Sequence, residues 1–273
     1  MSVRKGAPAL LSAGTLCTAL LLTGCASTAP SAPAGAPTSA PAAVGDSRPE
    51  GAPPRAAAGA GGPGEPTGSV SSAPVPAPRL PGLGPVTHGL VPDGTTQALV
   101  VTGATADAST STATLYARDA GGRWTVAAGP WAAHNALRGW TDDHVAGDLR
   151  SPIGVFRLGD AGGRLPDPGA RLPYDQDEEF AISGTGFLGE SLEGSFDHVI
   201  AIDYNRVPGR TPLDKERPLG AGKGGGVWIH VDHGGPTHAC VALEREDLRE
   251  LLRALDPSRE PVVVMGPAPV LAR

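Results

Sequence analysis

The sequence predicts a mainly β domain, a sandwich or barrel with one packing helix near its C-terminus, preceded by a disordered linker. Short segments rich in Val, Ile, Thr and aromatic residues, bounded by Gly, Asp and Pro, recur through residues 86–273. One stretch of the same region has helical periodicity. The preceding part is dominated by Pro, Ala and Gly, which cannot bury enough apolar surface to offset the entropy lost on ordering.

Residues 1–24 have the features of a secretory signal. Two basic residues precede an apolar run that ends at Leu22 and is too short and too poorly flanked to span a bilayer. The run closes with Leu22-Thr23-Gly24-Cys25, which resembles a bacterial lipobox, in which the cysteine thiol takes a lipid. We therefore expect Cys25 to be the lipidated first residue of the mature chain, at the outer face of the cell membrane or in the cell wall. A plain secretory signal would also place the protein outside the cytoplasm.

Residues 25–85 are expected to form a disordered linker. Residues 26–85 hold 14 of the 29 prolines, no aromatic residue, three acids and three bases. Such a composition favours a partly extended, polyproline-like stalk. The alternative is a segment that folds on a partner.

Residues 86–273 are long enough for one hydrophobic core and are expected to form a single folded domain. The expected helix covers 244–255, where Leu248, Leu251, Leu252 and Leu255 recur at helical spacing. The expected strands are short and rich in β-branched residues: 98–102, 113–117, 124–129, 154–158, 198–204, 226–231 and 261–265.

Composition excludes several classes of function. Aromatic residues make up 4% of the chain and the net charge is −6, which argues against a nucleic-acid binder. The three cysteines are too few for a disulfide scaffold. If the signal is removed and Cys25 is lipidated, Cys240 is the only free thiol of the mature chain.

The strongest chemical signal lies between residues 230 and 240, which hold three of the seven histidines and Cys240. A cysteine attacks as its thiolate, and a nearby imidazole can take the thiol proton. His230 ends an expected strand and would reach Cys240 if residues 234–236, Gly-Gly-Pro, fold the chain back. Its second ring nitrogen needs an acceptor that fixes the tautomer, and the carbonyl of Val231 would serve. The amides of Ala239 and Cys240 could bind an oxyanion.

Other interpretations of this cluster stay open. His233 could be the base in place of His230. Together His230, His233, His238 and Cys240 offer four plausible zinc ligands, although their spacing matches no familiar finger. The cluster could also be loop histidines beside a buried structural cysteine.

The cluster resembles the L,D-transpeptidase catalytic domain of the YkuD type, in a subgroup with a short His–Cys loop. That family has a strand ending in His, then Ser/Thr-His-Gly-Cys and an apolar residue, matched by His230 and residues 237–241, Thr-His-Ala-Cys-Val. Residues 150–156, Arg-Ser-Pro-Ile-Gly-Val-Phe, are similar to the family's Ser/Thr-Pro-x-Gly-x-Phe strand, and residues 203–206, Asp-Tyr-Asn-Arg, to its Tyr-Asn element. The resemblance covers about 122–266.

The resemblance implies a β-rich fold that acts on peptidoglycan stem peptides without metal or cofactor. We expect the protein to be a monomer. Cys240 would attack the carbonyl of the diamino acid at the third stem position and expel the terminal D-alanine. The thioacyl group would pass to an amine, as in a transpeptidase, or to water, as in a carboxypeptidase. His230 would be the base, and Thr237, His238 and Ala239 would line the site.

Two features leave alternatives open. Ala239 stands where the family has glycine, and this costs strain only if the residue has positive φ. A pseudoenzyme that only binds wall peptides is therefore the alternative from another functional class. Tyr204, Asn205 and Arg206 are candidate substrate contacts, with a structural role as the alternative.

Overall fold

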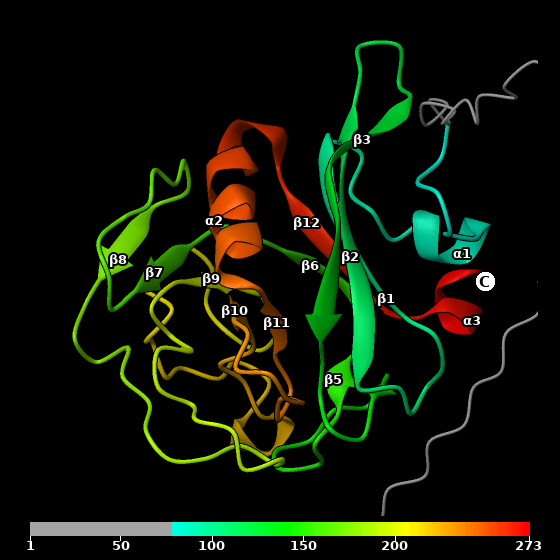
Figure 1. Cartoon of the computed structure of the whole chain (residues 1–273). Coiled ribbons are helices and arrows are strands. Elements are labelled where there is room, and N and C mark those ends of the chain that lie inside the picture. The colour runs from blue at the N-terminus through cyan, green and yellow to red at the C-terminus, as the bar shows by residue number, and fades with distance from the viewer. Residues whose placement is uncertain (1–77) are drawn as a thin grey trace, which may run out of the picture. The chain divides into compact units, whose positions relative to one another are not determined.

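The computed structural model describes residues 78–273, so the expected signal and all but the end of the expected linker lie outside the described residues. The described chain is mainly β, with one ten-stranded sheet that curls on itself and a helix of ten residues near the C-terminus (Figure 1). The predicted fold class is confirmed. None of the helices formed by residues 78–273 is long and apolar enough to cross a membrane.

The elements follow one another in a simple order along the chain. The helices are α1 (Pro85–His88), α2 (Arg245–Ala254) and α3 (Ala268–Leu271), with 3-10 turns at Ala221–Lys223 and Pro257–Arg259. The strands are β1 (Gln97–Gly103), β2 (Thr110–Arg118), β3 (Trp124–His134), β4 (Trp140–Thr141), β5 (Ser151–Pro152), β6 (Gly154–Arg157), β7 (Ala161–Gly163), β8 (Tyr174–Gln176), β9 (Val199–Ala201), β10 (Trp228–Val231), β11 (Val241–Leu243) and β12 (Val262–Pro267).

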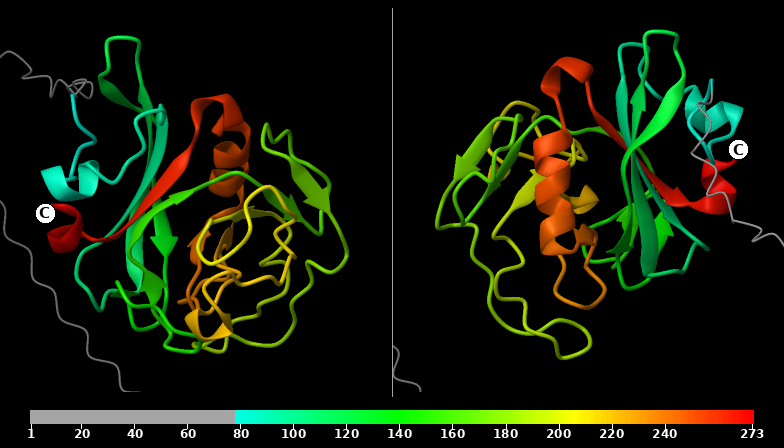
Figure 2. Two further views of the ribbon diagram at one scale, coloured as in Figure 1. Left: turned by 180° about the vertical axis from the view of Figure 1, so that it is seen from behind. Right: turned by 45° about the horizontal axis from the view of Figure 1, so that its top comes forward.

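The large sheet has the order β6-β12-β1-β2-β3-β11-β10-β9-β7-β8, and β4 pairs with β5 in a separate small sheet. The halves of the sheet face each other across α2, with β1, β2 and β3 on one side and β9, β10 and β11 on the other (Figures 1 and 2). Most neighbouring strands of the large sheet are antiparallel, but β1 pairs with β12, β10 with β11 and β7 with β8 in parallel.

Helix α2 fills the inside of the curl. Its sequence places leucines at spacings of three and four, so that one stripe faces inward. Leu248, Leu251 and Leu252 are fully buried among inward residues of both halves of the sheet, and Leu255 continues the stripe just after the helix. The expected helix 244–255 is therefore confirmed, with the observed ends one residue inside the expected ones.

Strand β1 is buried on both faces, which explains its unbroken apolar run. Leu99 and Val101 point into the main core, whereas Ala98 and Val100 join a second cluster on the outer face. Helices α1 and α3 lie side by side over that outer face (Figure 2). Leu80 belongs to the same cluster, so the packed chain includes residues ahead of 86.

Candidate active site

The connection between β10 and β11 positions the candidate residues. Parallel neighbours require the chain to return the length of a strand, which usually takes a dozen or more residues. Here residues 232–240 make the return, and Gly234 has φ +84°, a left-handed conformation that suits glycine. The expected fold-back of this loop is confirmed. The returning segment is fixed to the end of β3, because Thr237 donates its amide to Asn135 and accepts one from Leu137.

Strand register brings His230 and Cys240 to the same face of the sheet. His230 pairs with Ala242, and paired residues of parallel strands point the same way. Cys240 lies two residues before Ala242, immediately ahead of β11, and side chains two apart in extended chain share a face. Both residues line one cavity of about 140 Å³.

The imidazole of His230 is buried and oriented by the backbone. Its Nδ1 lies 2.9 Å from the carbonyl oxygen of Val231. Because a carbonyl only accepts, Nδ1 carries the proton and Nε2 of the neutral ring has a free lone pair. The expected acceptor for this ring is confirmed. Phe196 packs edge-on against the ring, with centroids 5.4 Å apart.

The sulfur of Cys240 contacts backbone groups at the start of β10. The amide of Trp228 donates to Sγ at 3.4 Å, and Sγ donates to the carbonyl of Gly226 at 3.8 Å. Within residues 78–273, Sγ makes no hydrogen bond to His230. The thiol therefore rests against the glycine-rich segment that precedes β10, which positions it without an ion pair.

Burial favours the neutral form of both groups. Desolvation raises the pKa of the Cys240 thiol to about 11, partly opposed by the Trp228 amide. Desolvation lowers the pKa of His230 to about 4, with a smaller effect from the neighbouring His233, while its bond to the Val231 carbonyl acts in the opposite direction. The resting site thus holds a thiol and a neutral imidazole, rather than a thiolate beside an imidazolium.

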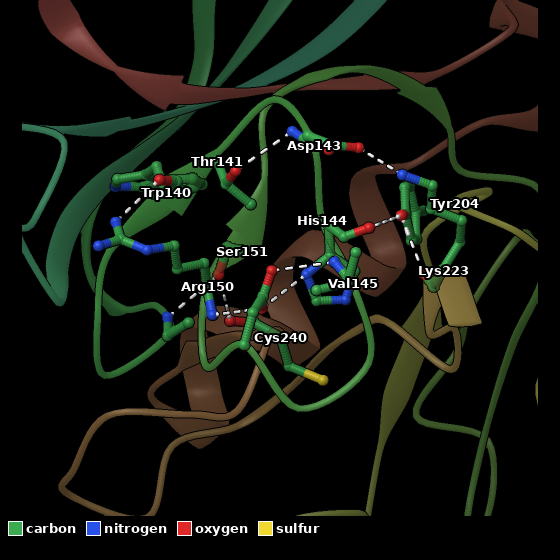
Figure 3. Close-up of polar contacts among 12 residues, drawn as sticks. Trp140, Thr141, Asp143, His144, Val145, Arg150, Ser151, Tyr204, Lys223 and Cys240 are labelled. Carbon is green, nitrogen blue, oxygen red and sulfur yellow. Dashed lines mark hydrogen bonds and ion pairs between the residues drawn. The ribbon is translucent and has the colours of Figure 1, made fainter. Parts of the chain in front are cut away.

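Two hydroxyl groups hold the carbonyl of Cys240. Thr237 Oγ1 donates to it at 2.6 Å and Ser151 Oγ at 3.4 Å. Ser151 is fully buried and also accepts the amide of Ala136 at 3.1 Å. Figure 3 shows Ser151 beside the backbone of Cys240, whose sulfur points away from it. The peptide after the cysteine is therefore fixed from two sides.

The amides of Ala239 and Cys240 remain free for a ligand. Neither donates a hydrogen bond to any residue that the structure describes. Ala239 does not have the positive φ that would strain an alanine, because Leu149, Asn205 and Glu260 are the non-glycine residues of the described chain with positive φ. Alanine therefore fits at this position without backbone strain.

The segment 182–196 covers the cavity. Ile182, Leu192 and Phe196 contribute apolar walls, together with the buried Ser195. Phe187 packs on the exposed His238, with ring centroids 4.8 Å apart. Thr237 and His238 also line the cavity, whereas Ala239 packs partly against the hydrophobic core.

A second imidazole lies beside His230. His233 stacks on it nearly in parallel, at an interplanar angle of 12° and a centroid distance of 5.8 Å. Its Nδ1 lies 3.1 Å from Oε1 of Glu190, which comes from the covering segment. The His233 side chain is 5% exposed and lines the same cavity.

The arrangement does not fit the zinc interpretation. In residues 78–273, no group of three or more His, Cys, Asp or Glu side chains is placed to hold a metal ion. The rings of His230 and His233 stack face to face, and each directs Nδ1 to a different partner. His238 packs instead against Phe187.

Tyr204 and Asn205 do not reach the cavity. The Tyr204 hydroxyl lies 2.9 Å from the carbonyl of Lys223 and 3.3 Å from that of His144, as Figure 3 shows. Asn205 is buried, donates to the carbonyl of Gly220 at 3.0 Å and accepts the amide of Leu219 at 2.7 Å. Both side chains therefore tie the 206–223 loop to the sheet, which favours the structural alternative, and a contact with substrate stays a prediction.

Arg206 is likewise a buried structural residue. Its side chain is 4% exposed and forms ion pairs with Asp160, at 2.8 Å, and Asp203. It also donates to the carbonyl of Arg210. Its guanidinium is thus held by partners inside the protein, and Arg206 is not among the residues that line the cavity.

The family model for the L,D-transpeptidase catalytic domain, YkuD, matches residues 103–264. The chain belongs to the L,D-transpeptidase catalytic domain family. Membership indicates a catalytic domain of the L,D-transpeptidase type. The matched region runs from the end of β1 into β12 and includes His230 and Cys240.

Solved structures similar to this L,D-transpeptidase domain include the helical cell shape determining protein Pgp2 from Campylobacter jejuni, with 18% identity and a TM-score of 0.34, covering 62% of this chain and 48% of that one. A K307A mutant of the same protein gives 17% identity and a TM-score of 0.33, with 62% and 47% covered. The chain spans about half the length of these structures. No curated protein matches the chain.

Sequence reasoning missed three contributors to the site of this L,D-transpeptidase domain. Ser151 was singled out only as part of a strand motif, although its hydroxyl contacts the Cys240 carbonyl. Glu190 lies 43 residues before its partner His233, and no local spacing links the two. The Trp228 contact uses a backbone amide, which leaves no signature in side-chain types.

Proposed function

We propose that the protein is a peptidoglycan L,D-transpeptidase in which Cys240 is the nucleophile and His230 the general base. The observation that carries the proposal is the placement of both residues on one face of two adjacent parallel strands, lining one cavity. The substrate would be a stem peptide with a diamino acid at its third position followed by D-alanine. The cysteine would form a thioester with the diamino acid and release D-alanine.

In the acylation step, the thiol proton moves to Nε2 of His230 as sulfur attacks the carbonyl carbon. A proton transfer coupled to attack suits a pair whose resting forms are both neutral. The Trp228 amide, which already donates to Sγ, stabilises negative charge as it develops on sulfur. The free amides of Ala239 and Cys240 are available to the oxyanion. The imidazolium then protonates the leaving amine, the C–N bond breaks, and the thioester remains.

The thioester is resolved by an amine or by water. Attack on the acyl carbon forms a second tetrahedral intermediate, which would use the same two amides. His230 takes a proton from the attacking amine or water, collapse breaks the C–S bond, and sulfur receives that proton. With an amine the product is a new peptide bond between stems, and with water it is a shortened stem.

Intact-protein mass spectrometry with a carbapenem tests the proposal. The strained acyl group of this β-lactam should add its full mass to Cys240 of the wild-type protein. Cys240→Ala should remove the adduct completely, and His230→Gln should slow its formation by at least about a hundredfold, the usual contribution of general base catalysis. His134→Gln is a matched control, because His134 lies on neighbouring β3 and outside the cavity. A wild-type protein that stays unlabelled would contradict the proposal.

A non-catalytic wall-binding protein is the second candidate. It is favoured by the high pKa of the Cys240 thiol, whose hydrogen bond goes to Gly226 rather than to His230. This candidate predicts no carbapenem adduct, together with binding of isolated stem peptides that Cys240→Ala leaves unchanged. The two candidates therefore give opposite results in the same pair of measurements.

The proposal includes a lipid anchor at Cys25, which rests on the sequence Leu22-Thr23-Gly24-Cys25. Cell fractionation tests it: the wild-type protein should be found in the membrane fraction, and Cys25→Ser should reduce this amount sharply. Because Cys25 lies outside the catalytic domain, purified domain activity should not change. An unchanged membrane fraction would contradict the anchor while leaving the proposed chemistry intact.

A further inference from the structure

The cavity that holds His230 and Cys240 contains a second imidazole with a different partner. His230 Nδ1 is held by a backbone carbonyl, whereas His233 Nδ1 lies 3.1 Å from a carboxylate oxygen of Glu190. A partner fixed at Nδ1 sets the tautomer of the ring and leaves Nε2 available. The two rings thus have different Nδ1 partners, while they stack at 5.8 Å and line the same cavity.

The contact between Glu190 and His233 is a closely packed one. A Cβ added to Gly186 would lie 2.0 Å from Oε1 of Glu190, and one added to Gly235 would lie 2.1 Å from the same atom. The Glu190 carboxylate thus occupies space that a side chain at Gly186 or Gly235 would fill. Its other oxygen accepts the Leu188 amide at 2.7 Å. The pKa of Glu190 is held below its usual range by backbone amides first and by His233 in addition, so the group is ionised.

The reactive nitrogen of His233 is free. Glu190 accepts from Nδ1, so Nε2 of the neutral ring carries the lone pair. Nε2 makes no hydrogen bond to any residue between 78 and 273, and it is not among the fully buried, unpartnered atoms of that part of the chain. An acceptor amine bound in the cavity can therefore give a proton to Nε2 of His233.

We propose that His233, positioned by Glu190, is a second acid–base residue, which takes the proton of the incoming amine when the thioacyl group leaves Cys240. The inference rests on the proposed function and deepens it. An acceptor amine arrives as an ammonium ion and cannot attack until it loses a proton. His230 is needed in the same half-reaction to carry a second proton, from the attacking nitrogen to sulfur.

The protons balance with two imidazoles. The ammonium gives one proton to Nε2 of His233, and the free amine attacks the thioester carbon. The tetrahedral intermediate gives a second proton from nitrogen to His230, the C–S bond breaks, and His230 returns that proton to sulfur. The imidazolium of His233 then loses its proton to solvent, and no further reactant is required.

The two half-reactions can be measured separately. The thioacyl-enzyme is formed from a tetrapeptide stem that ends in D-alanine, freed of excess donor, and mixed with glycinamide as the acceptor amine. Quenched samples give acylation from the mass of the protein, while transfer and hydrolysis are read from the two released products. We expect His233→Gln to lower the ratio of transfer rate to acylation rate at least tenfold. Glu190→Gln should lower the same ratio in the same direction, by less.

The control is His134→Gln. His134 also pairs with a carboxylate, because its Nδ1 lies 2.9 Å from Oδ2 of Asp232, but it does not line the cavity. This variant should keep the wild-type ratio. Carbapenem labelling of Cys240 in each variant confirms that the site is folded.

Several outcomes would overturn the inference. A His233→Gln ratio within twofold of wild type would do so, and so would an equal loss of acylation and transfer, which would place His233 in the first half-reaction. If the wild-type protein itself forms no thioester, it is the proposed function that fails. If His233→Gln is too unstable to be labelled, Glu190→Gln takes its place. A Glu190→Gln ratio within twofold of wild type, or an equal loss of acylation and transfer, would then overturn the inference.

Discussion

The hydroxyl of Thr237 donates a 2.6 Å hydrogen bond to the carbonyl of Cys240, three residues further along the chain. This bond fixes the end of the loop between β10 and β11 at Cys240, the residue that carries the thiol. Replacing Thr237 with Val keeps the shape and removes the donor, which should cost about 1 kcal/mol of stability. If the same energy is lost in the transition state, carbapenem acylation falls about fivefold. Thr237→Ser, which keeps the hydroxyl, should restore most of the rate, and equal rates for the two variants would contradict this role.

Ser151 should matter for stability more than its distance from the thiol suggests. Its hydroxyl is fully buried, accepts the Ala136 amide and donates to the Cys240 carbonyl. Ser151→Ala leaves that amide without a partner, at a cost of about 1–3 kcal/mol. Thermal unfolding followed by circular dichroism measures the loss. An unchanged melting temperature together with unchanged acylation would show that the bond is unimportant.

The pH dependence of the site distinguishes coupled proton transfer from a preformed ion pair. Because the pKa of His230 is lowered to about 4, the base is neutral and active above that value, so the acylation rate should rise through pH 4 and stay level through neutrality. Because the pKa of the thiol is raised to about 11, alkylation by iodoacetamide, which needs the thiolate, should be slow at pH 7 and rise steadily toward pH 11. Alkylation that is already maximal at pH 7 would contradict the neutral resting state.

Ala239 should be a neutral replacement for glycine. Its backbone has no positive φ, so Ala239→Gly removes no strain. The variant should acylate at a rate within about threefold of wild type and lose at most about 1 kcal/mol, because glycine has more freedom in the unfolded chain. A large gain in rate, measured with the carbapenem, would show instead that the alanine obstructs the oxyanion site.

Arg206 should act on stability and not on substrate binding. Arg206→Met leaves two buried carboxylates, Asp160 and Asp203, without their cation, at a cost of about 3–5 kcal/mol. Arg210→Ala is the matched control, because that arginine pairs at the surface, where an ion pair contributes about 0–1 kcal/mol. Urea unfolding compares the two variants. Below its melting temperature, Arg206→Met should still be labelled by the carbapenem at Cys240. Loss of labelling in folded protein would show instead that Arg206 contributes to the substrate site.

Residue patterns within short segments predicted the helix and strands whose formation depends mainly on neighbouring residues. The leucine spacing of α2 and the β-branched runs of β1, β2 and β12 each specify one element. The bond between His230 and the Val231 carbonyl was predictable because it joins adjacent residues. Strand β11 was not assigned, since it has three residues and its pairing with β10 and β3 depends on the sheet.

The candidate site was predictable where its reactive residues lie close together in the sequence. It was not predictable where a contact joins residues that are far apart in the chain. His230 and Cys240 lie ten residues apart, and a turn of glycines between them is enough to infer that they meet. Glu190 reaches His233 only because the covering segment folds over the cavity. The neutral state of the thiol follows from burial, which the sequence does not reveal.

Strand β12 inserts between β6 and β1, which lie more than fifty residues apart in the chain, and β1 pairs along its length with residues 262–267. Strand β1, near the start of the described chain, therefore cannot form all of its pairings until β12 is present. A nascent polypeptide cannot complete its sheet until nearly all of it has been synthesised, because the closing partner is made at the end. Contacts this far apart in sequence slow folding, so we expect the sheet to close late, after the local hairpin of β2 and β3 has formed.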